Sequence, residues 1–119
     1  MTDGAKDPDC LFCKIAAGDI DADVVHETDT TVAFRDLNPQ APTHVLVIPR
    51  SHYPNAATLA AGEPDTAVHL FEAAGAIADA EGLGEGYRLV LNTGAQANQT
   101  VFHAHMHVLG GRAMNWPPG

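Results

Sequence analysis

Apolar positions along the chain follow two periods, one typical of strands and one typical of helices. Short runs rich in β-branched and other apolar residues predict strands at residues 24–27, 31–34, 44–48 and 87–91, and a last strand at residues 101–109. Turn-forming residues separate neighbouring runs, a spacing typical of strands in an antiparallel sheet. The strand-rich part of the chain therefore predicts one mainly antiparallel sheet.

Two segments have a helical pattern. Residues 10–17 predict a short helix, with Asp9 as its N-cap and Gly18 as the residue that ends it. Residues 64–81 predict a long helix that begins at Pro64, a residue well suited to a first helical turn. Together with the strands, these helices predict an α+β fold. The apolar stripe of the long helix consists of Leu70, Phe71, Ala74, Ile77 and Ala78.

Polar segments divide and end these elements. Residues 36–42 (DLNPQAP) hold two prolines and predict a loop, and residues 92–99 (NTGAQANQ) predict a polar loop before the last strand. We expect residues 1–8 to be disordered and residues 9–119 to form a single domain. A chain of 119 residues suits one domain, and folding at this size buries roughly 65% of the surface of the unfolded chain.

Charge and composition limit the classes of partner. The formal net charge is −9, which argues against binding to long nucleic acids because such binding depends on basic surfaces. A mononucleotide remains compatible, since backbone N–H groups can hold a small anion in an acidic protein. No apolar run approaches the ~20 residues that span a bilayer, and the polar first residues do not resemble a secretory signal. We expect a cytoplasmic protein with reduced thiols and no membrane partner.

Three histidines near the C-terminus are the most informative feature. His103, His105 and His107 are spaced by two residues, so on a strand all three imidazoles point to one face, roughly 6.5–7 Å apart. Adjacent imidazoles disfavour one another's charged forms, so at least one is expected to be neutral near pH 7 and able to act as a nucleophile. The same row is also compatible with a metal site. The spacers, expected to face the core, are Ala104, Met106 and Val108.

The histidine pattern and its flanking segments resemble one family along nearly the whole chain. The segments are CLFCKIAAGDI near the N-terminus, FRDLNPQAPTHVLVIPRSH at residues 34–52, LNTGAQANQTVFHAHMHVLGGR at residues 91–112, and the tail WPPG. In this order they are similar to the histidine triad (HIT) family, in particular its Hint branch of purine nucleoside phosphoramidases. The resemblance implies a HIT-like α+β fold: a five-stranded antiparallel sheet with two helices, paired into a homodimer with a continuous sheet.

The resemblance also implies roles for individual residues. His105 matches the nucleophile that attacks the α-phosphorus of a nucleoside 5′-phosphoramidate and forms a nucleotidyl-histidine, which water then hydrolyses. His107 matches a phosphate contact, and His44 matches a position that orients the histidines; with His103 these residues form the expected catalytic set. The expected nucleotide-binding residues, from the base slot through ribose and phosphate to the tail, are Ile15, Ile20, Phe34, Asp36, Leu37, Asn92, Gln99, Thr100, His105, His107 and Trp116.

Two cysteines suggest a metal site. Cys10 and Cys13 alone are a weak signal, because a structural zinc site needs four ligands. Some bacterial members of the family resemble this chain in carrying two further ligands, here His52 and His103. The resemblance thus implies a closed, structural Zn²⁺ site that does not activate water. The other interpretation is that the cysteines are small buried apolar residues.

The sequence departs from the family pattern at two places, and other functions remain compatible with it. Ala97-Asn98 stands where the family usually carries Gly-Gly, and Asn tolerates a positive φ less well than Gly. Asn115 stands where close relatives often carry His. Other activities on the same nucleophile are cleavage of dinucleoside polyphosphates and nucleotidyl transfer. Further alternatives are a non-catalytic nucleotide-binding module and a catalytic metal centre at His103, His105 and His107.

Overall fold

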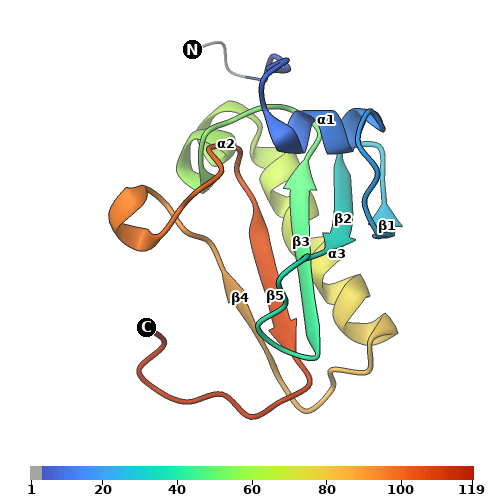
Figure 1. The fold of residues 1–119 in the computed structure, drawn as a ribbon, viewed down its shortest axis with the longest axis vertical. Helices are drawn as coiled ribbons and strands as arrows, with labels where there is room; N and C mark the ends of the chain where they lie inside the picture. The colour runs from blue at the N-terminus through green and yellow to red at the C-terminus, as the bar shows by residue number, and fades with distance from the viewer. Residues whose placement is uncertain (1–3) are drawn as a thin grey trace.

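The computed structural model describes residues 4–119, and its core is a five-stranded antiparallel sheet (Figure 1). The strands lie in the order β1-β2-β3-β5-β4, with β3 in the centre and β1 and β4 at the edges. The predicted antiparallel α+β sheet is thereby confirmed. The strands are β1 (Val24–Glu27), β2 (Thr31–Arg35), β3 (Thr43–Pro49), β4 (Tyr87–Val90) and β5 (Met106–Gly110).

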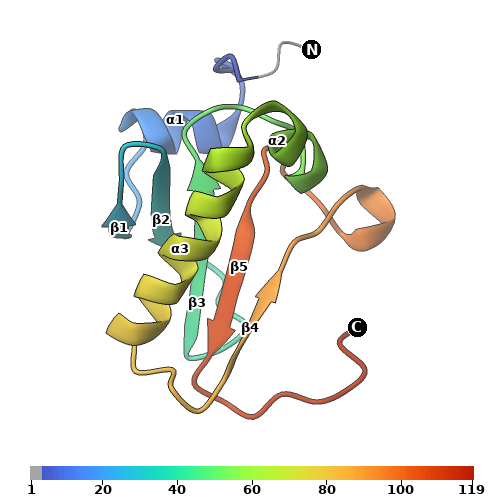
Figure 2. The ribbon, with the colours of Figure 1, turned by 180° about the vertical axis from the view of Figure 1, so that it is seen from behind.

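Helix α3 (Pro64–Ala80) covers one face of the sheet (Figure 2). Leu70, Ala74, Ile77 and Ala78 are buried, as the predicted stripe requires, and they pack in one cluster with the inward side chains of β3 and β5. Phe71 is an exception, because 55% of it is exposed. Its inclusion in the buried stripe was wrong: a helix presents only one stripe to a sheet, and Phe71 lies beside it.

Helix α1 (Leu11–Ala17) covers the other face of the sheet at one end. Phe12 packs there with Phe34 and Leu46 in a second buried cluster. Gly18 ends the helix with a left-handed φ of 82°, as predicted. The N-cap, however, is Cys10 rather than Asp9, because the Cys10 side chain accepts the bond from the backbone N–H of Cys13.

A third helix, α2 (Ala56–Gly62), corrects the prediction of two helices. It begins at Asn55, whose side chain accepts from the backbone N–H of Thr58 while the Thr58 hydroxyl lies 3.3 Å from the backbone nitrogen of Asn55. This reciprocal cap satisfies N–H groups that the first turn would otherwise leave free. Leu59 is its only large buried residue, which explains why apolar periodicity did not reveal the helix.

The segment before α1 makes a backbone contact with the segment after β3. Residues 1–3 lie outside the described residues, but the Gly4 backbone N–H donates to the carbonyl of His52 at 2.9 Å. Within residues 4–119, the helices are all too short or too polar to cross a membrane.

Candidate functional site

Strand alternation places the candidate histidines on the α1 side of the sheet. On β3, Val45 and Val47 face the α3 cluster, whereas Leu46 and Ile48 face the α1 cluster. His44 has the same parity as Leu46, and His107 is paired directly with Leu46. Both imidazoles therefore project from the α1 face of the sheet, from the paired strands β3 and β5.

The first two triad histidines do not lie on a strand, which corrects the predicted strand at residues 101–109. β5 begins only at Met106, and its partner β3 ends at Pro49, which lacks the N–H needed to extend the ladder. Instead, the Ala104 N–H donates to the carbonyl of Tyr53 at 2.7 Å. The extended alternation nevertheless continues, because Ala104 and Met106 are buried against the α3 cluster as expected.

A hydrogen bond to one nitrogen of the His105 ring fixes its orientation and its tautomer. Its Nδ1 lies 2.7 Å from the carbonyl oxygen of His103, and because a carbonyl only accepts, Nδ1 carries the proton. The neutral ring then keeps its lone pair on Nε2. Only 8% of His105 is exposed, and this burial lowers the pKa of the imidazole below its usual value. His105 is therefore a neutral base or nucleophile with a defined reactive atom.

A second hydrogen-bond chain fixes the tautomers of His44 and His107. The backbone N–H of Gln40 donates to Nδ1 of His44 at 3.0 Å, so the proton of neutral His44 is on Nε2. That Nε2–H donates to Nδ1 of His107 at 2.8 Å. His107 consequently carries its proton on Nε2, which becomes a donor for a ligand. Burial, with help from the neighbouring imidazoles, lowers the pKa of His107 to about 4, so this donor is uncharged at neutral pH.

The carboxylate of Asp36 completes this chain at the end of β2. Its Oδ2 lies 3.5 Å from Nε2 of His44, and its Oδ1 accepts from the backbone N–H of Asn38 at 2.8 Å. The net effect on His44 is still a lowered pKa, because burial outweighs the attraction of the carboxylate. Asp36 thus supplies negative charge at the rim of the histidine cluster without protonating it.

Four side chains beside the triad form a compact group of soft donors. Cys10, Cys13, His52 and His103 bring their ligand atoms within 4.8 Å of one another. Nδ1 of His103 lies 3.4 Å from Sγ of Cys10, 3.5 Å from Sγ of Cys13 and 3.2 Å from Nδ1 of His52. Sγ of Cys13 also lies 3.4 Å from Nδ1 of His52. These atoms come from α1, from the segment after β3 and from the triad.

The dimensions of this group fit a tetrahedral zinc ion. Bond lengths of ~2.3 Å to sulfur and ~2.0–2.1 Å to nitrogen imply edges of about 3.3 Å between nitrogens and about 3.6 Å between nitrogen and sulfur. His103 donates its Nε2–H to the carbonyl of Pro49 at 2.8 Å, which leaves Nδ1 unprotonated and facing the cysteines. Burial raises the pKa of the Cys13 thiol, a cost that a bound cation would offset.

The predicted phosphate loop lies next to the triad but is largely tied to itself. Val90, the last residue of β4, is paired with His107, so Asn92 starts the loop beside the triad. Asn92 donates through Nδ2 to the carbonyl of Ala97 at 2.7 Å. The Gln99 N–H donates to the carbonyl of Gly94 at 3.1 Å, a bond within the loop. Thr100 is exposed.

The Ala97-Asn98 departure has a visible consequence. Asn98 ends the 3₁₀ turn η1 (Ala95–Ala97) with a φ of 64°, the left-handed region that glycine occupies without strain. Among residues 4–119 it is the only non-glycine residue with a positive φ. Asn is the side chain that best tolerates this region, so the loop keeps a glycine-like turn. Asn115 accepts through its backbone carbonyl from Arg88 at 2.9 Å, a contact independent of its side chain.

The residues expected to form a base slot are dispersed. Phe34 is buried in the α1 cluster, and Ile15 packs against that cluster while staying partly exposed. Ile20 borders a separate cavity of about 340 Å³ beside Cys13. Leu37 and Trp116 are strongly exposed, at 101% and 81%. Within residues 4–119, Ile20 is the one member of this set that borders either of the two cavities described.

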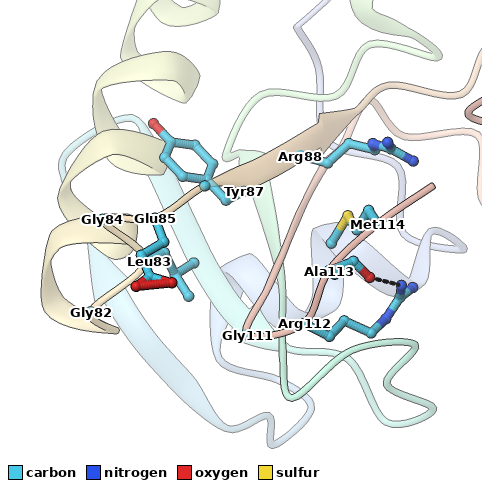
Figure 3. A pocket seen from close by; sticks show the side chains of 11 residues that line it. Gly82, Leu83, Gly84, Glu85, Tyr87, Arg88, Gly111, Arg112, Ala113 and Met114 are labelled. Atoms are coloured by element: carbon cyan, nitrogen blue, oxygen red, sulfur yellow. Dashed lines mark hydrogen bonds between the residues drawn. The ribbon is translucent and has the colours of Figure 1, made fainter. Parts of the chain in front are cut away.

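A further cavity lies away from the histidines (Figure 3). Its volume is about 660 Å³, and it is formed by the α3–β4 turn, the start of β4 and the segment after β5. Arg88 and Arg112 border it, whereas it contains none of the predicted site residues. Nothing in the residue pattern had indicated this cavity.

Two residues that the sequence did not single out contact the site. Phe12 meets the His105 ring edge-on at 5.1 Å between centroids, and it also contacts Phe34 and His103. Gln40 contacts His44 through its backbone N–H, so the type of its side chain does not indicate this contact. The Phe12 contacts with the histidines join segments far apart in the chain, and the Gln40 bond to His44 is local but comes from the backbone, so residue patterns carry no signal for either.

Comparison with known proteins agrees with this arrangement. The family model described as "HIT domain" matches residues 17–114. An uncharacterised HIT-like protein of Synechococcus elongatus is 50% identical over 111 residues, which cover 93% of this chain and 97% of the relative. A "14 kDa zinc-binding protein" of Zea mays is 44% identical over 115 residues, which cover 95% of this chain and 90% of the relative.

Solved structures are similar over nearly the full chain. A HIT family hydrolase from Legionella pneumophila Philadelphia 1 has 48% sequence identity and a TM-score of 0.89, with 93% of this chain and all of the other covered. A histidine triad protein from Clostridium difficile has 38% identity and a TM-score of 0.89, with 93% and 97% covered. The order and packing of the elements described above are therefore those of these proteins.

Proposed function

The chain belongs to the HIT domain family, and from that premise we propose that it hydrolyses the P–N bond of purine nucleoside 5′-phosphoramidates through a nucleotidyl-histidine on His105. At the level of the family, it resembles proteins described as hydrolases. One observation carries the finer proposal. The 2.7 Å bond from Nδ1–H of His105 to the His103 carbonyl leaves an unprotonated Nε2 on the reactive side of the ring.

The attack is a displacement at the α-phosphorus. Nε2 of His105 forms the new N–P bond as the substrate P–N bond breaks, and the leaving nitrogen keeps the electron pair and takes up a proton. The ring becomes cationic at this stage, and the carbonyl of His103 stabilises its Nδ1–H. Water then attacks the same phosphorus, releases the nucleoside 5′-monophosphate and returns His105 to its neutral form.

Several neighbours can stabilise the reacting phosphate. Nε2–H of His107 is an uncharged donor whose direction is fixed by the bond that its Nδ1 accepts from His44. Asn92 and Thr100 border the same end of β5 and would provide polar contacts if the loop rearranges on binding. His44 acts as a positioning residue, because it touches His107 rather than the substrate.

The remaining parts of a purine nucleotide match other groups near the cluster. The free face of the Asp36 carboxylate can accept bonds from the ribose hydroxyls. Ile15, Ile20, Phe34 and Leu37 provide apolar edges for the base, and an exposed Trp116 could close the slot from the tail. A slot that recognises a purine mainly by shape separates adenine from guanine only modestly.

Zinc is proposed as a structural cofactor held by Cys10, Cys13, His52 and His103. The similarity to a protein described as zinc-binding supports the metal, and the edge lengths of the donor group support a tetrahedral ion. With four protein ligands no position is open for water, so the ion would fix α1 and the His103 ring and take no part in the reaction. Thiolate ligands suit a reducing compartment such as the cytoplasm.

A homodimer with a continuous sheet is part of the proposal. β4 is an edge strand, and an uncovered edge is a template for pairing with another chain. Tyr87 on this strand is a large exposed apolar residue at that edge. Light scattering at micromolar concentration tests this state, and a monomer would contradict it.

The substrate is tested by comparing rates on an adenosine 5′-phosphoramidate and a diadenosine polyphosphate. We expect higher kcat/KM on the phosphoramidate, and His105→Ala should remove nearly all turnover while nucleotide binding persists. Faster cleavage of the polyphosphate would favour the alternative HIT activity. Turnover that survives His105→Ala would refute the assigned nucleophile, and binding without any turnover would favour a non-catalytic module. Loss of activity within seconds of chelator addition would favour a catalytic metal.

A further inference from the structure

A second group of metal ligands lies inside the proposed nucleotide site. Asp36, His44 and His107 bring one ligand atom each within 4.8 Å of one another, separately from the Cys–His group. The closest contacts are 2.8 Å between Nε2 of His44 and Nδ1 of His107, and 3.5 Å between Nε2 of His44 and Oδ2 of Asp36. We propose that this group is an inhibitory site for divalent transition-metal ions such as Zn²⁺.

The donor set suits such an ion. Two imidazoles and one carboxylate, with further positions open to solvent, are ligands that Zn²⁺, Cu²⁺ and Ni²⁺ accept, whereas Mg²⁺ prefers oxygen ligands. The ligand side chains lie on or directly beside the rigid central strands: His44 on β3, His107 on β5 and Asp36 just after β2. Little ordering is therefore needed on binding.

No net proton has to leave for the ion to bind, but His44 must change its tautomer. The two facing nitrogens share a single hydrogen, which His44 donates to His107. When this proton moves to Nδ1 of His44, both facing nitrogens offer a lone pair, and Nδ1 gives up the bond that it accepts from the Gln40 N–H. Asp36 supplies one negative charge to the resulting complex. Two zinc–nitrogen bonds of ~2.0–2.1 Å require the nitrogens to stand about 3.3 Å apart, so the rings must separate by about half an ångström.

Occupancy would block nucleotide binding in two ways. The ion would occupy the carboxylate proposed to accept the ribose hydroxyls, and it would replace the bond that directs Nε2–H of His107 toward phosphate. His105 is not a ligand, and its Nδ1–H bond to His103 stays intact. Inhibition should therefore be competitive, with the apparent KM multiplied by 1 + [metal]/Kd and kcat unchanged. This inhibition rests on the proposed function, whereas the metal site itself does not.

The first test measures binding without substrate, on untagged protein whose Cys–His group is already loaded with zinc. Zn²⁺ is titrated against a chromophoric chelator, and we expect one further equivalent per chain. Asp36→Asn should weaken this second equivalent at least tenfold and His44→Gln should remove it, with the first zinc retained in both. His69→Gln, which changes an imidazole on α3 that is bonded to Thr30, should leave it unchanged.

Some results would overturn the site. Absence of a second equivalent in the wild-type protein, or a second equivalent that persists in both variants, would show that ions bind elsewhere on an acidic surface. Equal binding of Mg²⁺ would argue for such surface carboxylates. Circular dichroism of Asp36→Asn and His44→Gln confirms folding. If His44→Gln fails to fold, Asp36→Asn decides the outcome alone, because the Asp36 side chain is partly exposed and its change is less disruptive.

A second measurement separates the metal site from the proposed reaction. If the protein turns over a phosphoramidate, Zn²⁺ should raise its KM in the wild type and much less in Asp36→Asn. Inhibition that lowers kcat at constant KM would refute the proposed blocking of the nucleotide. If no nucleotide is turned over, the proposed function fails, while the stoichiometry of bound zinc still decides the metal site.

Discussion

Phe12 offers a sharp test of the idea that packing on the α1 face positions the nucleophile. Its ring is buried and lies edge-on to His105, His103 and Phe34 at centroid distances of 5.1, 6.0 and 5.5 Å. Phe12→Ala removes this support and should cost about 3–5 kcal/mol of unfolding free energy. Phe12→Leu keeps most of the volume but loses the aromatic contacts, each worth about 0.5–1.5 kcal/mol, and should cost about 1–3 kcal/mol.

The control lies on the opposite face of the sheet. Leu70 is as deeply buried, but it packs in the α3 cluster and is not part of the proposed site. Leu70→Ala should cost about 2–5 kcal/mol, similar to the Phe12 variants. Domains of this size are stable by about 5–15 kcal/mol, so the variants should remain folded at moderate temperature.

The assay combines denaturant unfolding with steady-state hydrolysis of the phosphoramidate. A nucleophile displaced by about 1 Å can lose 10²-fold in rate, so we expect kcat to fall about tenfold or more in Phe12→Leu. Leu70→Ala should keep kcat within about twofold of the wild-type value. A wild-type kcat in Phe12→Leu, or an equal loss of kcat in Leu70→Ala, would refute the positioning role and leave Phe12 a purely structural residue.

Three further predictions concern pH, metal and loop geometry. Burial lowers the pKa of His105, and that of His107 to about 4, so protonation should reduce kcat/KM only below the usual histidine pKa of ~6.5. A pH–rate profile with its acid limb at or above 6.5 would contradict this. A chelator that removes zinc from the Cys–His group should lower the Tm by about 10 °C, since each kcal/mol of lost stability lowers the Tm of such a domain by about 4 °C or more. An unchanged Tm in metal-free protein would reject structural zinc. Asn98→Ala should destabilise the protein by about 1–2 kcal/mol because of its positive φ, whereas Asn98→Gly should be nearly neutral in the same unfolding measurement.

Local patterns predicted the parts of the fold that depend on local physics. The β-branched runs became β1 to β4, and the apolar stripe of α3 was right except for Phe71. Gly18 ended α1 as its conformational freedom indicates. The Ala-rich α2 was missed because it buries one large side chain and depends on a cap between Asn55 and Thr58.

The site was less accessible to prediction, because its geometry depends on contacts between distant segments. The histidine spacing suggested a strand, but the strand starts at Met106, since Pro49 at the end of β3 lacks the N–H that would extend the ladder and the Ala104 N–H bonds to Tyr53 instead. The tautomer of His107 depends on the backbone of Gln40 through His44, and the support of His105 depends on Phe12. Resemblance supplied candidate residues, whereas only the fold shows which nitrogen of each ring is free.

The most direct measurement is chemical trapping of the intermediate. The protein is mixed with an adenosine 5′-phosphoramidate, quenched within one turnover and examined by intact mass and peptide mapping. We predict one adenylyl group per chain on the peptide that contains His105, absent in His105→Ala and present in His107→Gln if that variant still binds nucleotide. An adduct on another residue, or efficient turnover with no adduct at any quench time, would contradict nucleophilic catalysis by Nε2 of His105.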